Sequence, residues 1–125
     1  MTPSEFLTTL WGNPPPAWVL IWTLPGKNST WFQDFTHVDR YVNAHLDRDI
    51  YTGVSAKSGS KFPSRHERCT NANAAGIPGL WADIDLDDDV HVKANLPETV
   101  EDALCALPPE YPPSIVVHSG HGLQG

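Results

Sequence analysis

Apolar and polar positions along the chain follow patterns that predict three helices and four strands. Apolar residues at helical spacing predict helices, and short apolar runs bounded by turn residues predict strands. The segments expected to be helical are 3–11, 36–46 and 97–107, and those expected to be strands are 17–24, 49–56, 79–86 and 114–119. Their order predicts one α+β domain, a layered α/β structure in which helices pack against a mixed sheet.

The first helix has the clearest start signal. Thr2 can cap it, Pro3 suits its first position, and Glu5 completes a capping box. Two segments rich in turn-forming residues, 25–30 and 57–77, are expected to be loops. The second is long for a compact domain, and long ordered loops are often functional.

Charge is divided unevenly along the chain. The net charge of −7 argues against a simple nucleic-acid-binding module. Six of the eight Lys and Arg residues lie between Arg40 and Arg68, whereas nine acids and one base lie between Asp83 and Glu110. A basic segment beside an acidic one suits a site for metal and phosphate, although two unrelated solvated surfaces would give the same pattern. The basic residues of the predicted loop, which could contact phosphate or simply be solvated, are Lys57, Lys61, Arg65 and Arg68.

The sequence favours a cytoplasmic location. Its start has no basic region followed by an apolar core, and its longest apolar run, residues 17–24, is too short to cross a bilayer. Cys69 and Cys105 lie far apart without a paired motif, which indicates free thiols in a reducing compartment. His66 and Cys69 have a spacing that zinc can use, but no second pair completes a site.

The segment LWADIDLDDD, residues 80–89, carries five carboxylates within seven residues at the end of a predicted strand. Alternate side chains of a strand share a face. One face would hold Trp81, Asp83, Asp85 and Asp87, and the core face would hold Leu80, Ala82, Ile84 and Leu86. Carboxylates about 7 Å apart along a strand can share two divalent ions roughly 3.5–4 Å apart. We therefore expect Asp83 and Asp85 to bind metal, and residues 87–89 to form a solvated acidic turn.

A glycine-rich turn, residues 119–122, follows the last predicted strand. Ser119 can donate a hydrogen bond and His121 can contact a triphosphate. Gly120 and Gly122 allow backbone N–H groups to turn toward phosphate oxygens. Such a turn by itself is most often only a hairpin. Here, however, it and the acidic segment end two predicted strands joined by one helix, so the two motifs could lie side by side.

Together these motifs resemble the archaeo-eukaryotic primase superfamily, specifically the bifunctional primase-polymerase (prim-pol) proteins of phages, plasmids and bacteria. The resemblance is carried by GIPGLWADIDLDDD and PPSIVVHSGHGLQG, supported by VLIWTLP and DIYTGVSAKS, and it covers nearly the whole chain. Asp83 and Asp85 match the family's Asp-x-Asp motif. The family's Ser/Gly turn with a nucleotide-contacting histidine is matched by Ser119, Gly120, His121 and Gly122. Many relatives place that histidine where Gln124 stands, so His121 and Gln124 are both candidates.

The resemblance implies a DNA primase or polymerase that performs template-directed nucleotidyl transfer in DNA replication, on an RRM-like palm. It implies Mg²⁺ or Mn²⁺ at Asp83 and Asp85, nucleoside triphosphates at the turn, a single-stranded DNA template near the basic loop, and a helicase domain or protein as a further partner. The family's third metal-binding acid lies on a later strand. Residues 1–125 are therefore expected to be the N-terminal part of a prim-pol catalytic domain, with an incomplete palm.

Other functions also fit the residues. A metal-dependent phosphoesterase or nuclease uses clustered carboxylates but needs no triphosphate-binding turn, so nucleotide binding would separate it from a polymerase. A module that only binds single-stranded nucleic acid would need exposed aromatic and basic residues on its sheet face, where Asp83 and Asp85 stand instead. A replication initiator whose primase fold has lost activity is a third alternative.

Overall fold

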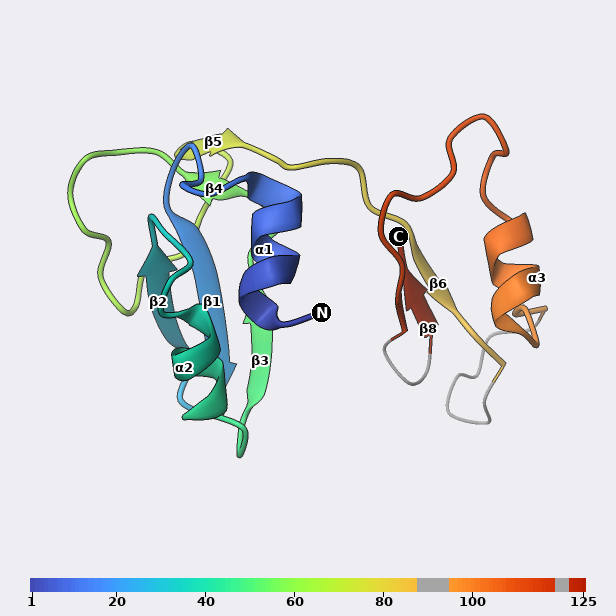
Figure 1. Ribbon diagram of the computed structural model, residues 1–125, viewed down its shortest axis with the longest axis horizontal. Coiled ribbons are helices and arrows are strands. Elements are labelled where there is room, and N and C mark those ends of the chain that lie inside the picture. Colours follow the sequence, from blue (N-terminus) through green and yellow to red (C-terminus); the bar gives the residue numbers. More distant parts are fainter. Residues whose placement is uncertain (88–94, 119–121) are drawn as a thin grey trace. The chain divides into compact units, whose positions relative to one another are not determined.

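The computed structural model describes residues 1–87, 95–118 and 122–125, and it divides into two compact units, Met1–Gly79 and Leu80–Gly125 (Figure 1). Both units combine short helices with small antiparallel sheets. The expected α+β class is therefore confirmed. The expectation of a mixed sheet is not, because every strand pair among the described residues is antiparallel.

The first unit contains two helices and two sheets. Its elements are α1 (Pro3–Trp11), β1 (Val19–Leu24), β2 (Asn28–Phe32), α2 (Val38–Asn43), β3 (Asp49–Thr52), β4 (Ala56–Lys57) and β5 (Ala74–Gly76). One sheet has the order β2-β1-β3, and β4 pairs with β5 in a second. Helix α1 begins with the predicted capping box: the Thr2 hydroxyl accepts the Glu5 N–H, and the Glu5 carboxylate accepts the Thr2 N–H.

The two faces of the β2-β1-β3 sheet bury different layers. Val19 and Ile21 of β1 point toward α1 and α2, where they meet Leu7 and Val38 in the main core. The helices cover this side of the sheet (Figure 1). Side chains alternate along a strand, so neighbouring positions of β1 face the other way. Trp18, Leu20 and Trp31 form a second apolar cluster there, with Trp22 and Cys69 packed against it.

The segment after β4 is an ordered loop that attaches to this second face. The Trp18 indole N–H donates to the Gly59 carbonyl at 2.9 Å, and the Trp31 indole N–H donates to the Ser64 carbonyl at 3.1 Å. The Ser29 N–H on the outer edge of β2 donates to the Arg65 carbonyl at 2.7 Å. Buried indole N–H groups need hydrogen-bond acceptors, and here the loop carbonyls supply them. These bonds hold the loop backbone against the sheet.

Two expected boundaries in the first unit are wrong. Residues 25–30 were expected to be a loop, but β2 begins at Asn28, opposite Thr23 of β1. Asn and Ser are poor strand formers, and burial of Ser29 and Trp31 outweighs that preference. The strand expected over 49–56 is split, because β3 ends at Thr52 and Ala56 pairs instead with β5, inside the expected loop.

The second unit is a three-stranded sheet with one helix. Its elements are β6 (Asp83–Asp85), α3 (Val100–Cys105), β7 (Val117–His118) and β8 (Gly122–Gln124), and the strand order is β6-β8-β7. Ala103 of α3 packs with Leu86 and Leu123 in a separate small core. Strand β8 thus lies in the middle of the sheet, although no strand was predicted after the glycine turn that ends at Gly122.

Expected boundaries in the second unit also shorten. A strand was expected over 79–86, but only Asp83–Asp85 form one, as β6. The alternation of side chains predicted that Leu80 would face the core, but Leu80 is 93% exposed. Helix α3 starts after Thr99, whose hydroxyl accepts the Asp102 N–H, so residues 97 and 98 precede the helix. The last expected strand is reduced to β7. In the described parts of the chain, no helix is long and apolar enough to cross a membrane.

Candidate functional site

The two segments predicted to carry the chemistry are hydrogen-bonded neighbours in the second unit. Strands β6 and β8 pair antiparallel, with Asp83 opposite Gln124, Ile84 opposite Leu123 and Asp85 opposite Gly122. The sequence could only suggest that the acidic strand and the residues after the glycine turn lie side by side. Their direct pairing brings two of the candidate nucleotide-binding residues, Gly122 and Gln124, to both candidate metal ligands.

The hydrogen-bond pattern decides how close these residues come. Ala82 and Gly125 exchange both backbone hydrogen bonds, at 2.8 and 3.0 Å. Bonded and non-bonded pairs alternate along an antiparallel ladder, so Asp83 and Gln124 form a non-hydrogen-bonded pair. In such pairs the Cα atoms are about 4.5 Å apart and the side chains lie on the same face. Gln124 and Asp83 thus project from one face at directly opposed positions.

The predicted alternation of β6 holds where the strand exists. Ile84 and Leu86 contribute to the core beneath α3. Asp83 is exposed and Asp85 is half-buried, on the opposite face from Ile84. Asp87 is exposed beyond the end of the strand, where its N–H donates to the Pro97 carbonyl at 2.9 Å. Asp83 and Asp85 therefore belong to the strand, whereas Asp87 lies beyond its end.

Gly122 permits a very close approach between β6 and β8. A Cβ atom at this position would lie 2.6 Å from the Ile84 carbonyl oxygen and 3.3 Å from the Asp85 Cα. Both atoms belong to the backbone, so neither can move aside without disturbing the strand. The glycine is required here by space, and its role is to bring β8 against the strand that carries the carboxylates.

Several predicted residues fall outside the described part of the chain. These are Ser119, Gly120 and His121 of the glycine turn, together with Asp88 and Asp89 of the acidic segment. Of the turn and its flank, Gly122 is buried and Gln124 is exposed on β8. Between the two candidates for the nucleotide-contacting residue, Gln124 is the one whose position is known.

The described donor set suits a hard divalent cation. Asp83 and Asp85 supply two carboxylates on one face, and the side chain of Gln124, opposite Asp83, carries an oxygen of the kind that Mg²⁺ and Mn²⁺ accept. Within residues 1–87, 95–118 and 122–125, no group of three or more His, Cys, Asp or Glu side chains gathers as a metal site. A cation bound here would therefore use two acids of the described chain.

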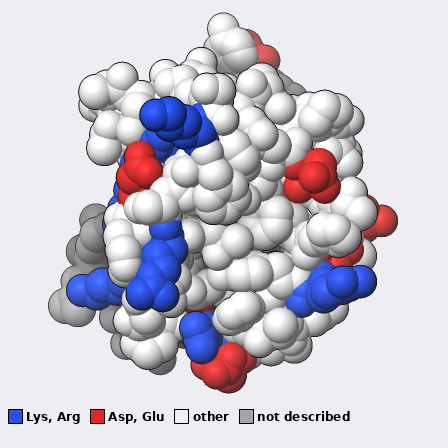
Figure 2. All heavy atoms as spheres, turned by 90° about the vertical axis from the view of Figure 1, so that its left-hand side faces the viewer, with Lys and Arg blue, Asp and Glu red and all other residues white. Residues whose placement is uncertain are grey.

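The basic loop of the first unit is partly engaged in its own structure. Lys57 forms an ion pair with Glu67 at 3.3 Å. The pKa of Glu67 is lowered, first because its carboxylate accepts the Ser64 N–H and then because of Lys57. Figure 2 shows Lys and Arg side chains spread over the side of the first unit where this loop lies, with Asp and Glu side chains among them. Cys69, whose spacing from His66 zinc could use, packs against the second apolar cluster and donates to the Ala56 carbonyl.

An aromatic and cationic cluster on the first sheet was missed from the sequence. Tyr51 of β3 lies opposite Trp22 of β1, with ring centroids 5.5 Å apart. The guanidinium carbon of Arg68 sits 4.0 Å from the centroid of the Trp22 ring. Trp22 is partly buried and packs against the second apolar cluster. Nothing in the sequence indicated this cluster, because Arg68 reaches Trp22 of β1 only through the folded path of the loop.

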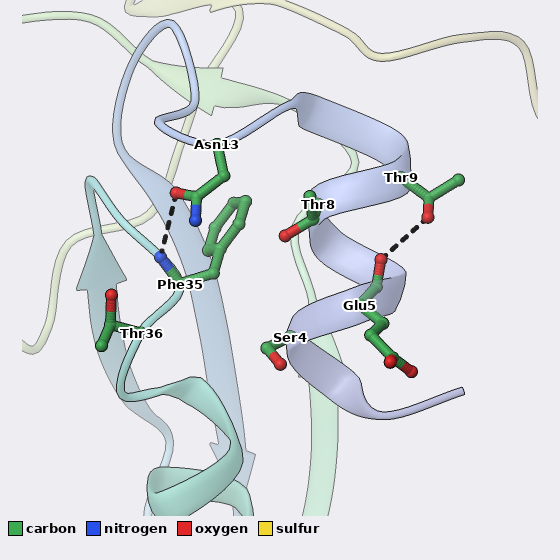
Figure 3. A pocket seen from close by; sticks show the side chains of 7 residues that line it. All are labelled: Ser4, Glu5, Thr8, Thr9, Asn13, Phe35 and Thr36. Carbon is green, nitrogen blue, oxygen red and sulfur yellow. Dashed lines mark hydrogen bonds between the residues drawn. The ribbon is translucent and has the colours of Figure 1, made fainter.

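A pocket of about 350 Å³ lies beside α1 in the first unit (Figure 3). Its lining is rich in hydroxyl and amide groups around Phe35 and consists of Ser4, Glu5, Thr8, Thr9, Asn13, Phe35 and Thr36. Much of this polarity is used internally: the Asn13 side chain accepts the Phe35 N–H, and the Thr9 hydroxyl donates to the Glu5 carbonyl (Figure 3). We interpret this pocket as part of the packing contact between α1 and the segment before α2.

No protein-family model, no curated protein and no solved structure matches this chain. Function is therefore inferred from the residues and their geometry.

Proposed function

We propose that this chain performs template-directed nucleotidyl transfer as a DNA primase or polymerase of the prim-pol type, with the second unit as part of an RRM-like palm. The observation that carries the proposal is the register of β6 and β8. It joins an Asp-x-Asp strand directly to the strand that follows a Ser-Gly-His-Gly turn. Asp83–Asp85 and Gly122–Gln124, which come from the two segments that carry the resemblance, thus share one small sheet.

The roles follow from the chemistry of each group. Asp83 and Asp85 would hold Mg²⁺ or Mn²⁺, which when bound acidifies a 3′-hydroxyl and offsets the charge that develops at an α-phosphate. The Gln124 amide N–H group can donate to a phosphate oxygen from the same face as Asp83. Gly122 adds no side chain beside Asp85 and keeps the two strands close. The residues 119–121 would complete the grip on the triphosphate.

The partners in this proposal are nucleoside triphosphates and a single-stranded DNA template, with a helicase domain or protein acting in the same process. Cys69 and Cys105 are both free thiols, in keeping with a reducing, cytoplasmic setting.

Metal-dependent nucleotide binding tests the proposal. A labelled nucleoside triphosphate is titrated with the protein in Mn²⁺ and in EDTA, and the double variant Asp83→Asn/Asp85→Asn is compared with the wild type. We expect binding that needs Mn²⁺ and is lost in the double variant. The matched control is Glu98→Gln/Glu101→Gln, which removes the same charge from exposed positions of the same unit.

Each other result counts against the polymerase proposal. If the protein binds Mn²⁺ but no nucleotide, a metal-dependent phosphoesterase or nuclease explains the carboxylates better, and hydrolysis of a model phosphodiester becomes the next assay. If nucleotide binds but a primed template is not extended, an inactive replication initiator is favoured. If the control variant loses binding as fully as the Asp83 and Asp85 variant does, bulk charge rather than a site is responsible.

A further inference from the structure

The first unit presents an aromatic and cationic surface on the sheet face opposite its helices. Tyr51 and Trp22 lie side by side on β3 and β1, and Arg68 stacks on the Trp22 ring. Tyr51 is 48% exposed. Phe62 is 70% exposed and touches Trp18 only through an edge-to-face contact at 5.2 Å. Two aromatic rings of one face are therefore open to solvent.

The loop that supplies the cations is held in a defined position. Its hydrogen bonds to Trp18, Trp31 and the edge of β2 anchor Gly59, Ser64 and Arg65 on the sheet. Preorganised groups bind at a lower entropic cost than groups that must first be ordered. The loop is thus a rigid support for its side chains.

Positive charge on this loop is left over after internal pairing. Glu67, the loop's acid, is engaged by Lys57 and by the Ser64 N–H. Within the described residues, no ion pair involves Lys61, Arg65 or Arg68. The whole-chain charge of −7 hides this surface, because residues 1–79 contain seven of the eight Lys and Arg but only six of the fifteen Asp and Glu.

We propose that this face, defined by Tyr51, Trp22, Phe62, Arg65 and Arg68, binds single-stranded nucleic acid. Unpaired bases offer flat faces that stack on exposed aromatic rings, and the phosphates between them attract the loop arginines. A duplex buries its base faces and would meet only the charge. An acidic protein segment would use the cations but would leave the exposed rings without a matching partner.

This inference does not depend on nucleotidyl transfer, since all of its residues lie in the first unit. In the proposed reaction, the single strand bound by this face would be the template. The two ideas can fail separately: the Asp83→Asn/Asp85→Asn variant should bind oligonucleotide as the wild type does, even if it has lost the nucleotide.

The test is fluorescence anisotropy with a labelled oligo(dT) of about 20 nucleotides at low salt, roughly 50 mM. Tyr51→Ala should weaken binding at least about fivefold because one stacking platform is removed. The matched control is Tyr111→Ala, which removes a 79% exposed ring from the second unit and should leave affinity unchanged. Circular dichroism confirms that each variant is folded.

A second set of variants tests the cations. Arg65→Gln and Arg68→Gln should each lower the slope of log K against log salt by about 0.7, as expected for one lost phosphate contact to a single strand. Arg65 donates to the His66 ring nitrogen at 3.1 Å, and among the contacts described the cation on the Trp22 ring is Arg68, so the Arg65 variant separates charge from packing at Trp22. Arg40→Gln, exposed on α2, is the control and should keep the full slope.

The proposal is overturned if the wild type does not bind oligo(dT) at low salt. It is also overturned if Tyr51→Ala and Arg68→Gln bind like their controls, or if a duplex of equal length binds as tightly as the single strand.

Discussion

Asp83 and Gln124 lie directly opposite each other on β6 and β8, as a non-hydrogen-bonded pair whose side chains share one face of the sheet. The two residues come from segments separated by α3 and β7. An acidic group that can hold a cation and an amide that can bind phosphate are thus brought together by strand pairing, and this is the basis for expecting a nucleotide site.

Replacing Gln124 tests its role as a phosphate donor. Gln124→Ala should weaken Mn²⁺-dependent nucleotide binding about tenfold, because a hydrogen bond to a charged group is lost. Isothermal titration calorimetry measures the affinity, and Gln33→Ala, at an exposed position of the first unit, is the control. An unchanged affinity would assign the nucleotide contact to His121 instead.

Adding a methyl group at Gly122 should disturb the candidate site. In Gly122→Ala the new Cβ would meet the Ile84 carbonyl oxygen at 2.6 Å, so β6 and β8 must separate. We expect a loss of about 1–3 kcal/mol in the free energy of unfolding, measured by urea denaturation. Gly76→Ala is the control, since nothing lies within 4 Å of its new Cβ. Equal stability of the two variants would contradict the close approach.

Two threonines that face the main core should respond in opposite directions to the same change. Thr23 is fully buried and, among the described residues, its hydroxyl has no hydrogen-bond partner. Thr23→Val should therefore stabilise the fold by about 1 kcal/mol. The Thr30 hydroxyl donates to the Tyr41 hydroxyl at 2.9 Å, so Thr30→Val should destabilise it by about 1 kcal/mol. Thermal unfolding of both variants would show shifts of the same sign if the Thr23 hydroxyl were in fact paired.

The contact between Ser4 and Asp39 should affect how the free energy of unfolding changes at acidic pH. The Asp39 carboxylate accepts the Ser4 hydroxyl at 2.6 Å and the Ser4 N–H at 2.8 Å, and these two bonds, in that order, lower the pKa of Asp39 below its ordinary value of 3.8. A carboxyl whose pKa is lower in the folded state stabilises the fold above its unfolded pKa. This contribution is lost as the pH falls through the folded pKa.

Ser4→Ala removes the larger of the two causes, so the pKa of Asp39 should rise toward 3.8. The variant should lose stability at neutral pH and should lose less than the wild type on further acidification below pH 3.8. NMR titration of the Asp39 side chain measures the pKa directly. Thr8→Ala, an exposed position on the same helix, should leave that titration unchanged.

Local signals in the sequence determined the parts of this protein that depend on near neighbours. Thr2 and Glu5 predicted the start of α1 because a capping box involves residues only three apart. The alternation of Asp83, Ile84 and Asp85 predicted which side chains face the core and which carboxylates stand together, because a strand has a period of two.

Only the tertiary structure decided where distant segments pair. Gly122 to Gln124 were expected to end a turn, yet they form the central strand of the second sheet, because β6 and β7 supply partners on both sides. Arg68 reaches Trp22 because the loop is anchored by indole N–H groups far away in sequence. Hydrogen bonds and stacking between remote residues leave no periodic trace in either segment. The residue types of the candidate site could therefore be predicted from the sequence, whereas the strand pairing that brings them together could not.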